Sequence, residues 1–341
     1  MSKGLVVVTG ASGFIAKHIV LQLLNQGYSV RATVRSTSRE AELRAAMSQH
    51  VDDGASVERL LSFARLDLEQ DQGWDAALAG ADALIHTASP FPLIQPKNEE
   101  DVVRPAVDGT LRALRSAKRA NVSRVVLTSS GLAVLLAQPN GKSRLDESDW
   151  SSPDDPRATP YAKSKIMAER AAWTFVEAEP AIDLTVINPG FVIGAPLDRS
   201  SGTSLRVIQR LLESKDPMLP KFGFPVVDVR DVAQMHVACL AEPESIGKRY
   251  LGGDQFLWFP EMAKILQSAF ANRRIVTRQA PNFVIRLLAL FDSEIRTIVP
   301  NLDQRTEVTA ERARRELGMS FRPAAEAVVS AGRFLIDNKL V

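Results

Sequence analysis

Residues 161–165 read Tyr-Ala-Lys-Ser-Lys and place a phenol and an ammonium four positions apart. A threonine and a proline precede them in a pattern typical of a helix start, so we expect a helix to about Glu177 with Tyr161 and Lys165 on one face. A phenol with an ammonium one turn away is a candidate acid or base. To act near neutral pH, the pKa of the phenol must fall from about 10 by roughly three units, which is about 4 kcal/mol. An ammonium at about 4 Å in an effective dielectric near 20 supplies about that much.

Ser130 is a second group that can act on the same substrate atom. It follows an apolar run at Arg124 to Thr128 that predicts a strand, and the ligands of a parallel sheet gather where its strands end. A hydroxyl there can donate to the carbonyl oxygen that Tyr161 protonates, which holds this oxygen while a hydride arrives at carbon. The alternative is that Tyr161 and Lys165 are an exposed pair that only keeps a helix soluble.

The hydride must come from a cofactor, and residues 5–27 have the pattern of a dinucleotide-binding segment. A continuous apolar, β-branched run is followed by apolar residues at helical spacing, which predicts a buried strand and then an amphipathic helix. Gly10, Gly13 and Ala16 form a Gly-x-x-Gly-x-x-Ala turn between them. Backbone amides can approach a pyrophosphate there, at the positive end of the helix, so we expect the phosphates on Ser12 to Ile15. The spacing differs by one inserted residue from the Gly-x-Gly-x-x-Gly fingerprint, and such a turn can also bind nothing.

Arg35 stands at the end of the second expected strand, Ser29 to Val34. The residue at this tip faces the adenosine ribose. An acidic side chain there suits a free 2′-hydroxyl, and an arginine accommodates a 2′-phosphate through paired donors. Because no aspartate or glutamate occurs between this strand and Glu40, the sequence favours NADP over NAD. An arginine at a strand end can also be simply solvated.

Strands and helical segments alternate along the first 240 residues. Further strands are expected at Leu60 to Leu66, Ala83 to His86, Arg124 to Thr128 and Leu184 to Asn188. This order predicts the α/β class, with a Rossmann-type, doubly wound parallel sheet and a smaller C-terminal substrate lobe. We expect residues 1–188 and about 225–242 to form the NADP-binding domain, and residues 189–224 and 243–341 to form the substrate-binding lobe.

Residues that follow the middle strands are placed to contact the cofactor. Asp67 and Leu68 follow the third strand and are expected at the adenine. The small-residue turn that contains Ala88 can lie close to a ribose. His86 is interpreted as a core residue, because a lone histidine that ends an apolar strand is more often packed than catalytic.

The composition is that of an ordinary globular protein of 341 residues, 45% hydrophobic and 24% charged. The formal net charge of +2 does not indicate nucleic-acid binding. The single cysteine, Cys239, cannot form an intrachain disulfide and is expected in the core. No signal peptide is recognised, and the apolar run 283–291 is too short for a membrane helix and contains Arg286. We expect a soluble cytoplasmic protein, a monomer or homodimer, without a metal.

Taken together, these motifs resemble the extended short-chain dehydrogenase/reductases, and more narrowly the group of dihydroflavonol reductases, cinnamoyl-CoA reductases and microbial aldehyde and ketone reductases. The resemblance is carried by Val-Thr-Gly-Ala-Ser-Gly-Phe-Ile, Arg-Ala-Thr-Val-Arg, Thr-Ser-Ser, Tyr-x-x-x-Lys and Asn-Pro-Gly-Phe-Val-Ile-Gly, in this order. It implies NADPH as the cofactor and a catalytic trio of Ser130, Tyr161 and Lys165, with Ser130 preferred over Ser129. It implies a cofactor site lined by Gly10, Ser12, Gly13, Phe14, Ile15, Arg35, Asp67, Leu68, Ala88, Tyr161, Lys165, Pro189 and Val192.

One position departs from the plant enzymes of this group. Leu135 stands where dihydroflavonol reductases usually place a polar residue that holds the hydroxyls of the flavonoid. An apolar wall cannot form those hydrogen bonds, so we expect polyphenols to be poor substrates. The residues expected to form a hydrophobic substrate pocket are Phe91, Leu93, Leu135, Phe191, Phe222 and Phe224. Each of them could instead be an ordinary core residue.

The sequence therefore favours an NADPH-dependent reductase of a hydrophobic aldehyde or ketone, with Tyr161 as the general acid. A second interpretation keeps the fold but makes the chain an NAD-dependent sugar-nucleotide epimerase or dehydratase, against which Arg35 and the apolar pocket residues argue. A third is a non-catalytic, NADP-binding redox sensor. Such proteins usually lose the tyrosine and lysine pair, which this chain retains.

Overall fold

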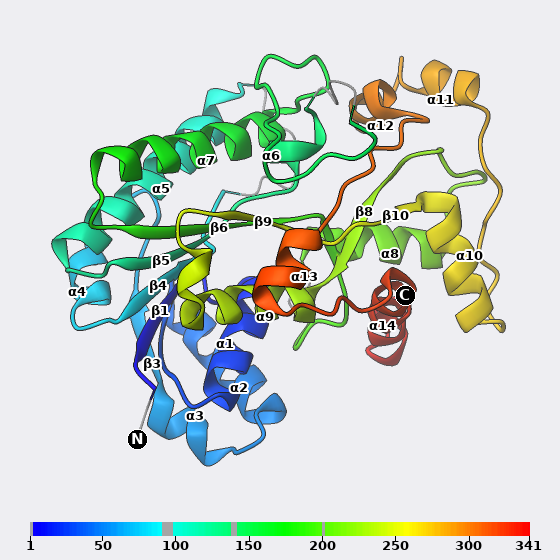
Figure 1. The fold of residues 1–341 in the computed structure, drawn as a ribbon. Helices are drawn as coiled ribbons and strands as arrows, with labels where there is room; N and C mark the ends of the chain where they lie inside the picture. The colour runs from blue at the N-terminus through cyan, green and yellow to red at the C-terminus, as the bar shows by residue number, and fades with distance from the viewer. Residues whose placement is uncertain (1–2, 91–97, 138–141, 200–201) are drawn as a thin grey trace.

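The computed structural model describes residues 3–90, 98–137, 142–199 and 202–341. Its main sheet has seven parallel strands in the order β3-β2-β1-β4-β5-β6-β9 (Figure 1). The strands are β1 Leu5–Thr9, β2 Ser29–Val34, β3 Leu61–Arg65, β4 Ala83–His86, β5 Arg124–Thr128, β6 Asp183–Pro189 and β9 Arg249–Gly252. The strand order reverses between β1 and β4, and a doubly wound sheet forms its ligand crevice at such a reversal.

Helices cover both faces of this sheet (Figure 1). The helices on one face are α1 Phe14–Asn25, α2 Thr37–His50, α3 Ala55–Leu60 and α9 Val229–Ala241, and those on the other are α4 Trp74–Leu78, α5 Glu100–Arg119 and α7 Pro160–Ala178. The β1 side chains show how the sequence produces two cores. Val6 and Val8 pack into the core with α1, whereas Val7 packs into the core with α5, because successive strand residues point to opposite faces.

A second, three-stranded sheet lies beside the first. Its strands β7 Phe191–Ile193, β8 Gly223–Asp228 and β10 Gln255–Trp258 have the order β10-β8-β7. The other helices are α6 Leu132–Leu135, α8 Thr203–Glu213, α10 Phe259–Ala269, α11 Asn282–Leu288, α12 Ser293–Ile298, α13 Glu311–Leu317 and α14 Ala324–Asp337, with short 3₁₀ turns η1 Pro243–Ser245 and η2 Val299–Asn301. Apolar residues of α8, α10 and α14 form a separate core against β7 and β8.

The chain passes from one sheet to the other at Gly190, directly after β6. A β-carbon at this position would lie 2.4 Å from the carbonyl oxygen of Pro225 in β8. Only a glycine allows the two backbones to approach so closely. This crossing therefore fixes where the second sheet lies relative to the end of β6.

The predicted strands form as expected, and β2, β4 and β5 have the predicted bounds. β9, inside the range 243–341, extends the main sheet beside β6, and β8 belongs to the second sheet. The domain bounds remain a prediction. Within the described residues, no helix is long and apolar enough to cross a membrane.

Candidate active site

A cavity of about 1500 Å³ opens where the strands of the main sheet end. At one end it is lined by the glycine turn after β1 and by the residues that follow β2 and β3. Ser130 and Tyr161 line its middle, and Phe191, Phe222 and Phe224 line the part formed by the second sheet. A cavity of this volume has room for a dinucleotide and a small apolar substrate together.

The glycine turn fits a pyrophosphate. Gly10 has φ +63°, and a β-carbon on it would lie 3.0 Å from the Cα of Ala88, so β1 and the turn after β4 approach closely. Helix α1 begins after Gly13, where the structure shows no side-chain cap and no acidic residue in the first turn. The positive end of α1 therefore faces the cavity with no acidic residue in its own first turn, and a phosphate is stabilised at such an end.

The predicted cofactor residues lie around this cavity with one exception. The residues that line it are Gly10, Ser12, Gly13, Phe14, Ile15, Arg35, Asp67, Leu68, Ala88, Tyr161, Pro189 and Val192. Lys165 does not line the cavity, because it is buried beneath Tyr161. The positions of these residues around the cavity suit a bound dinucleotide. That they bind the cofactor stays a prediction.

Two arginines lie at the end of β2. Arg35 is exposed and lines the cavity, as the sequence predicts, and Arg39 from α2 lines it as well. Arg39 also donates to Glu42 at 2.7 Å in an exposed ion pair. Arg39 is not among the site residues predicted from the sequence, although it follows Arg35 by only four positions. Two guanidiniums here suit a 2′-phosphate better than a free 2′-hydroxyl.

Tyr161 and Lys165 are placed by the start of α7. Thr159 caps this helix by accepting a hydrogen bond from the amide of Ala162 at 3.2 Å, and Pro160 occupies the first helical position. The Nζ atom of Lys165 lies 5.9 Å from the centre of the Tyr161 ring, and the Lys165 side chain is buried. The phenol thus lines the cavity with the ammonium behind it.

Burial shifts both pKa values. It raises the pKa of Tyr161 above its ordinary value, and it lowers the pKa of Lys165 to about 8, against the opposing charge of Glu169. The spacing of the two residues predicts that the ammonium lowers the pKa of Tyr161. In the chain itself the loss of water around the phenol dominates instead. Tyr161 therefore holds its proton at neutral pH, which is the form that a general acid needs.

The two adjacent serines have different partners. Ser129 is buried and donates its hydroxyl to the carboxylate of Glu169. Ser130 lines the cavity, and its Oγ accepts from the amide of Leu132 at 3.2 Å, so its own proton can be donated toward a substrate. This arrangement supports Ser130, rather than Ser129, as the serine that meets a substrate.

The far part of the cavity is aromatic. The Phe191 and Phe224 rings stack with their centres 5.0 Å apart, and Phe222 meets Phe224 edge-on at 4.7 Å. Leu135, almost fully buried, contributes an apolar wall. The predicted pocket residues Phe91 and Leu93 lie outside the described residues. Other apolar residues that line this part of the cavity are not among those predicted from the sequence, and they include Met218, Val284, Ile285, Leu288, Ile295 and Ile298.

Within the described ranges, the structure contains no group of three or more histidine, cysteine, aspartate or glutamate side chains that could hold an ion. Cys239 is buried, as the sequence predicts, and burial raises the pKa of its thiol to about 12. His86 is buried as well, as predicted, and shares a hydrogen bond of 2.8 Å with Thr9.

A doubly wound parallel sheet, a glycine turn at the start of α1 and a tyrosine and lysine on one helix face define the class of extended short-chain dehydrogenase/reductases. Residues 6–252 match the NAD dependent epimerase/dehydratase family. The chain belongs to this family and, within it, to the group related to dihydroflavonol and cinnamoyl-CoA reductases.

Two plant relatives and one solved structure illustrate the similarity. The chain is 34% identical over 282 residues to tetraketide alpha-pyrone reductase 1 of Arabidopsis thaliana, which covers 81% of this chain and 84% of the relative. It is 36% identical over 282 residues to cinnamoyl-CoA reductase 1 of Petunia hybrida, covering 82% and 81%. The yeast methylglyoxal/isovaleraldehyde reductase Gre2 complexed with NADPH superposes with a TM-score of 0.81 at 26% identity, covering 99% of this chain and 100% of that chain.

Proposed function

We propose that this protein reduces a hydrophobic aldehyde or ketone to an alcohol with NADPH, and that Tyr161 is the general acid. The chain is an NADP-dependent oxidoreductase. The reductases among its relatives and the NADPH complex of the yeast enzyme support this class and cofactor. The observation that carries the proposal is that Ser130 and Tyr161 lie between the glycine turn and the aromatic cluster in one continuous cavity.

Different residues along the cavity bind different parts of the cofactor and of the substrate. The backbone from Ser12 to Ile15 binds the pyrophosphate, and Arg35 and Arg39 bind the 2′-phosphate. When bound, NADPH supplies the hydride. In this way the glycine turn and the arginines set the position and orientation of the cofactor relative to Tyr161.

At the other end, Ser130 and Tyr161 hold the carbonyl oxygen of the substrate by two hydrogen bonds. The phenol of Tyr161 gives its proton to that oxygen as the carbon is reduced, so the alcohol leaves without a free alkoxide. The ammonium of Lys165 then stabilises the phenolate that remains. The aromatic wall excludes water and places an apolar substituent.

Two other functions are disfavoured by particular residues. An NAD-dependent sugar-nucleotide epimerase or dehydratase needs a pocket for a second diphosphate, whereas this end of the cavity contains Phe191, Phe222 and Phe224. A non-catalytic redox sensor has no need of a tyrosine that lines the cavity with a lysine behind it. Cytoplasmic location and oligomeric state remain predictions from the sequence.

The test is a panel of carbonyl compounds with NADPH consumption as the readout. We expect aryl and branched aliphatic aldehydes and ketones to have a higher kcat/KM than dihydroflavonols or sugar nucleotides, because Leu135 and the phenylalanines cannot pair polar groups. A dihydroflavonol or a nucleotide sugar at the top of the panel would contradict the proposed substrate class. Absence of NADPH consumption with every carbonyl would contradict the reaction.

A further inference from the structure

A buried carboxylate lies one turn beyond Lys165 on the same face of α7. Glu169 is 1% exposed, and three elements outside its own helix provide its partners. It accepts from Ser129 at the end of β5 and from the side-chain amide of Asn188 in β6 at 2.7 Å, and it pairs with Arg249 in β9 at 2.6 Å. A carboxylate is stable in a protein interior only when such partners compensate for its lost hydration. The burial of Glu169 beside the site therefore calls for an explanation.

The hydrogen bonds of Glu169 lead directly to Ser130. Asn188 is fully buried and donates both to Glu169 and, at 3.1 Å, to the carbonyl oxygen of Ser130. The amide of Ser129 donates to the carbonyl of Ile187 in β6 at 2.8 Å. The turn that presents Ser130 to the cavity is thus tied to Glu169 by the side chains of Ser129 and Asn188.

Arg249 holds the carboxylate in place from the opposite side. Its Nη1 donates to the carbonyl oxygens of Glu147 and Asp149 at 2.9 Å each, and its guanidinium lies 3.7 Å from the centre of the Trp150 ring. Because both partners of the ion pair are buried, the pair has a fixed geometry rather than the loose one of a surface pair. Strand β9 is thereby linked to the catalytic face of α7.

Glu169 is also the negative charge that faces Lys165. Around that lysine, Tyr161 is a neutral phenol, and burial together with the lysine charge lowers the pKa of His86 on β4 to about 3, so His86 is neutral. The charged residues Asp101 and Asp108 of α5, the helix packed along α7, are exposed to solvent, as is Arg104. Helix α6 carries no charged residue. The charge of Glu169 raises the pKa of Lys165 against the effect of burial, and the same carboxylate pairs with Arg249.

We propose that Glu169 is a positioning residue for this site: it fixes the turn that carries Ser130, and it holds a carboxylate one helical turn from Lys165. The role in turnover rests on the function proposed above. The effect on Lys165 belongs to the chain alone and can be measured without a cofactor or a substrate. The two parts are therefore testable separately.

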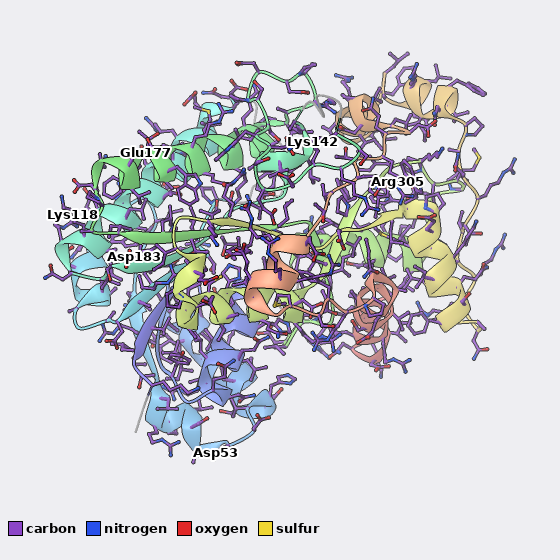
Figure 2. All side chains as sticks on the ribbon, viewed as in Figure 1. Asp53, Lys118, Lys142, Glu177, Asp183 and Arg305 are labelled. Carbon is purple, nitrogen blue, oxygen red and sulfur yellow. The ribbon has the colours of Figure 1, made fainter. Side chains whose placement is uncertain are left out.

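The first experiment is an NMR titration of Lys165 in the cofactor-free protein with ¹³C-labelled lysine, the signal being identified by its loss in Lys165→Arg. Glu169→Gln keeps the shape of the side chain and removes its charge. We expect the pKa of Lys165 to fall by about one unit in this variant. The matched control is Glu177→Gln on the same helix, because Glu177 is exposed at the outer end of α7 (Figure 2) and should leave the titration unchanged.

The second experiment measures turnover and NADPH affinity in the same variants. Glu169→Gln should lower kcat roughly tenfold to a hundredfold and shift the alkaline limb of its pH profile downward, with the Kd of NADPH changed less than about twofold. Glu177→Gln should match the wild type. A Lys165 titration and a pH profile that Glu169→Gln leaves unchanged would overturn the proposal, even if the variant is less stable.

Loss of the Glu169 charge leaves Arg249 buried without its partner, which could unfold the variant. The double variant Glu169→Gln/Arg249→Met removes both charges and avoids this cost. It should show the same lowered pKa of Lys165, and a wild-type pKa in a folded double variant also overturns the proposal. If the wild type reduces no carbonyl compound, the function fails, while the titration still decides the effect of Glu169 on Lys165.

Discussion

The Nζ atom of Lys165 lies 5.9 Å from the centre of the Tyr161 ring, one turn further along α7. Lys165 is buried while Tyr161 lines the cavity, so a substrate meets the phenol and not the ammonium. The lysine therefore acts on the reaction through its charge. This makes the protonation state of Lys165 a property that turnover should report.

We expect kcat for carbonyl reduction to fall as the pH rises through about 8, the value to which burial lowers the pKa of Lys165. Below that pH the ammonium is present, and above it the positive charge beside Tyr161 is lost. The measurement is kcat against pH under conditions where the hydride step limits the rate. Lys165→Arg, which stays charged, should lack this alkaline limb. A wild-type kcat that stays constant across the pKa of Lys165 would argue against this role.

Cofactor choice should depend on Arg35. Its guanidinium lines the cavity at the end of β2, and a charged hydrogen bond to the 2′-phosphate is worth roughly 1.5 to 3 kcal/mol. Arg35→Ala should therefore reduce the ratio of kcat/KM for NADPH over NADH roughly tenfold to a hundredfold. Arg59→Ala removes an exposed guanidinium of α3 that does not line the cavity, and it should keep the wild-type ratio. If Arg35→Ala leaves the ratio of kcat/KM for NADPH over NADH unchanged, Arg35 does not bind the 2′-phosphate.

Stability should decrease in mild acid because buried histidines are neutral in the fold. Burial lowers the pKa of His18 and of His236 to about 4, below the ordinary 6.5, so the unfolded chain binds these protons first. Each histidine contributes stability that is lost as the pH falls from about 6.5 toward about 4. At pH 5 the loss in unfolding free energy reaches about 2 kcal/mol per histidine. In His236→Gln, the loss in unfolding free energy between pH 7 and pH 5 should be smaller by about that amount. An equal loss in both proteins would show that His236 does not titrate this way.

The sequence predicts much of the main sheet because β1, β2 and β5 are short, mostly buried runs rich in β-branched residues. β2 and β5 have the predicted bounds for this reason. β9 was not expected, since a four-residue strand that begins with Arg249 has no apolar alternation to recognise. Its position follows from pairing with β6 more than sixty residues earlier, which is a tertiary effect.

The candidate site is predictable to a similar degree. Spacing alone places Tyr161 over Lys165 and the glycine turn at the start of α1. Spacing does not reveal that Lys165 is buried, nor that Glu169 meets Arg249 from a strand 80 residues away. Pairs of this kind depend on which strand ends next to which helix, and that information appears only once the chain is folded.

The most direct test of the account is Tyr161→Phe, which removes the proton donor and little of the cavity surface. We expect kcat on a good aldehyde substrate to fall by about 10² to 10⁴, with the Kd of NADPH changed less than about twofold. Tyr28→Phe, which alters a tyrosine outside the cavity, should behave as the wild type.

The decisive measurement is kcat of Tyr161→Phe with a primary deuterium isotope effect from labelled NADPH, which shows that the hydride step limits the rate. If Tyr161 is the general acid, kcat falls by at least about a hundredfold while NADPH binding is unimpaired. A variant that keeps more than about a tenth of the wild-type kcat under these conditions would contradict Tyr161 as the general acid.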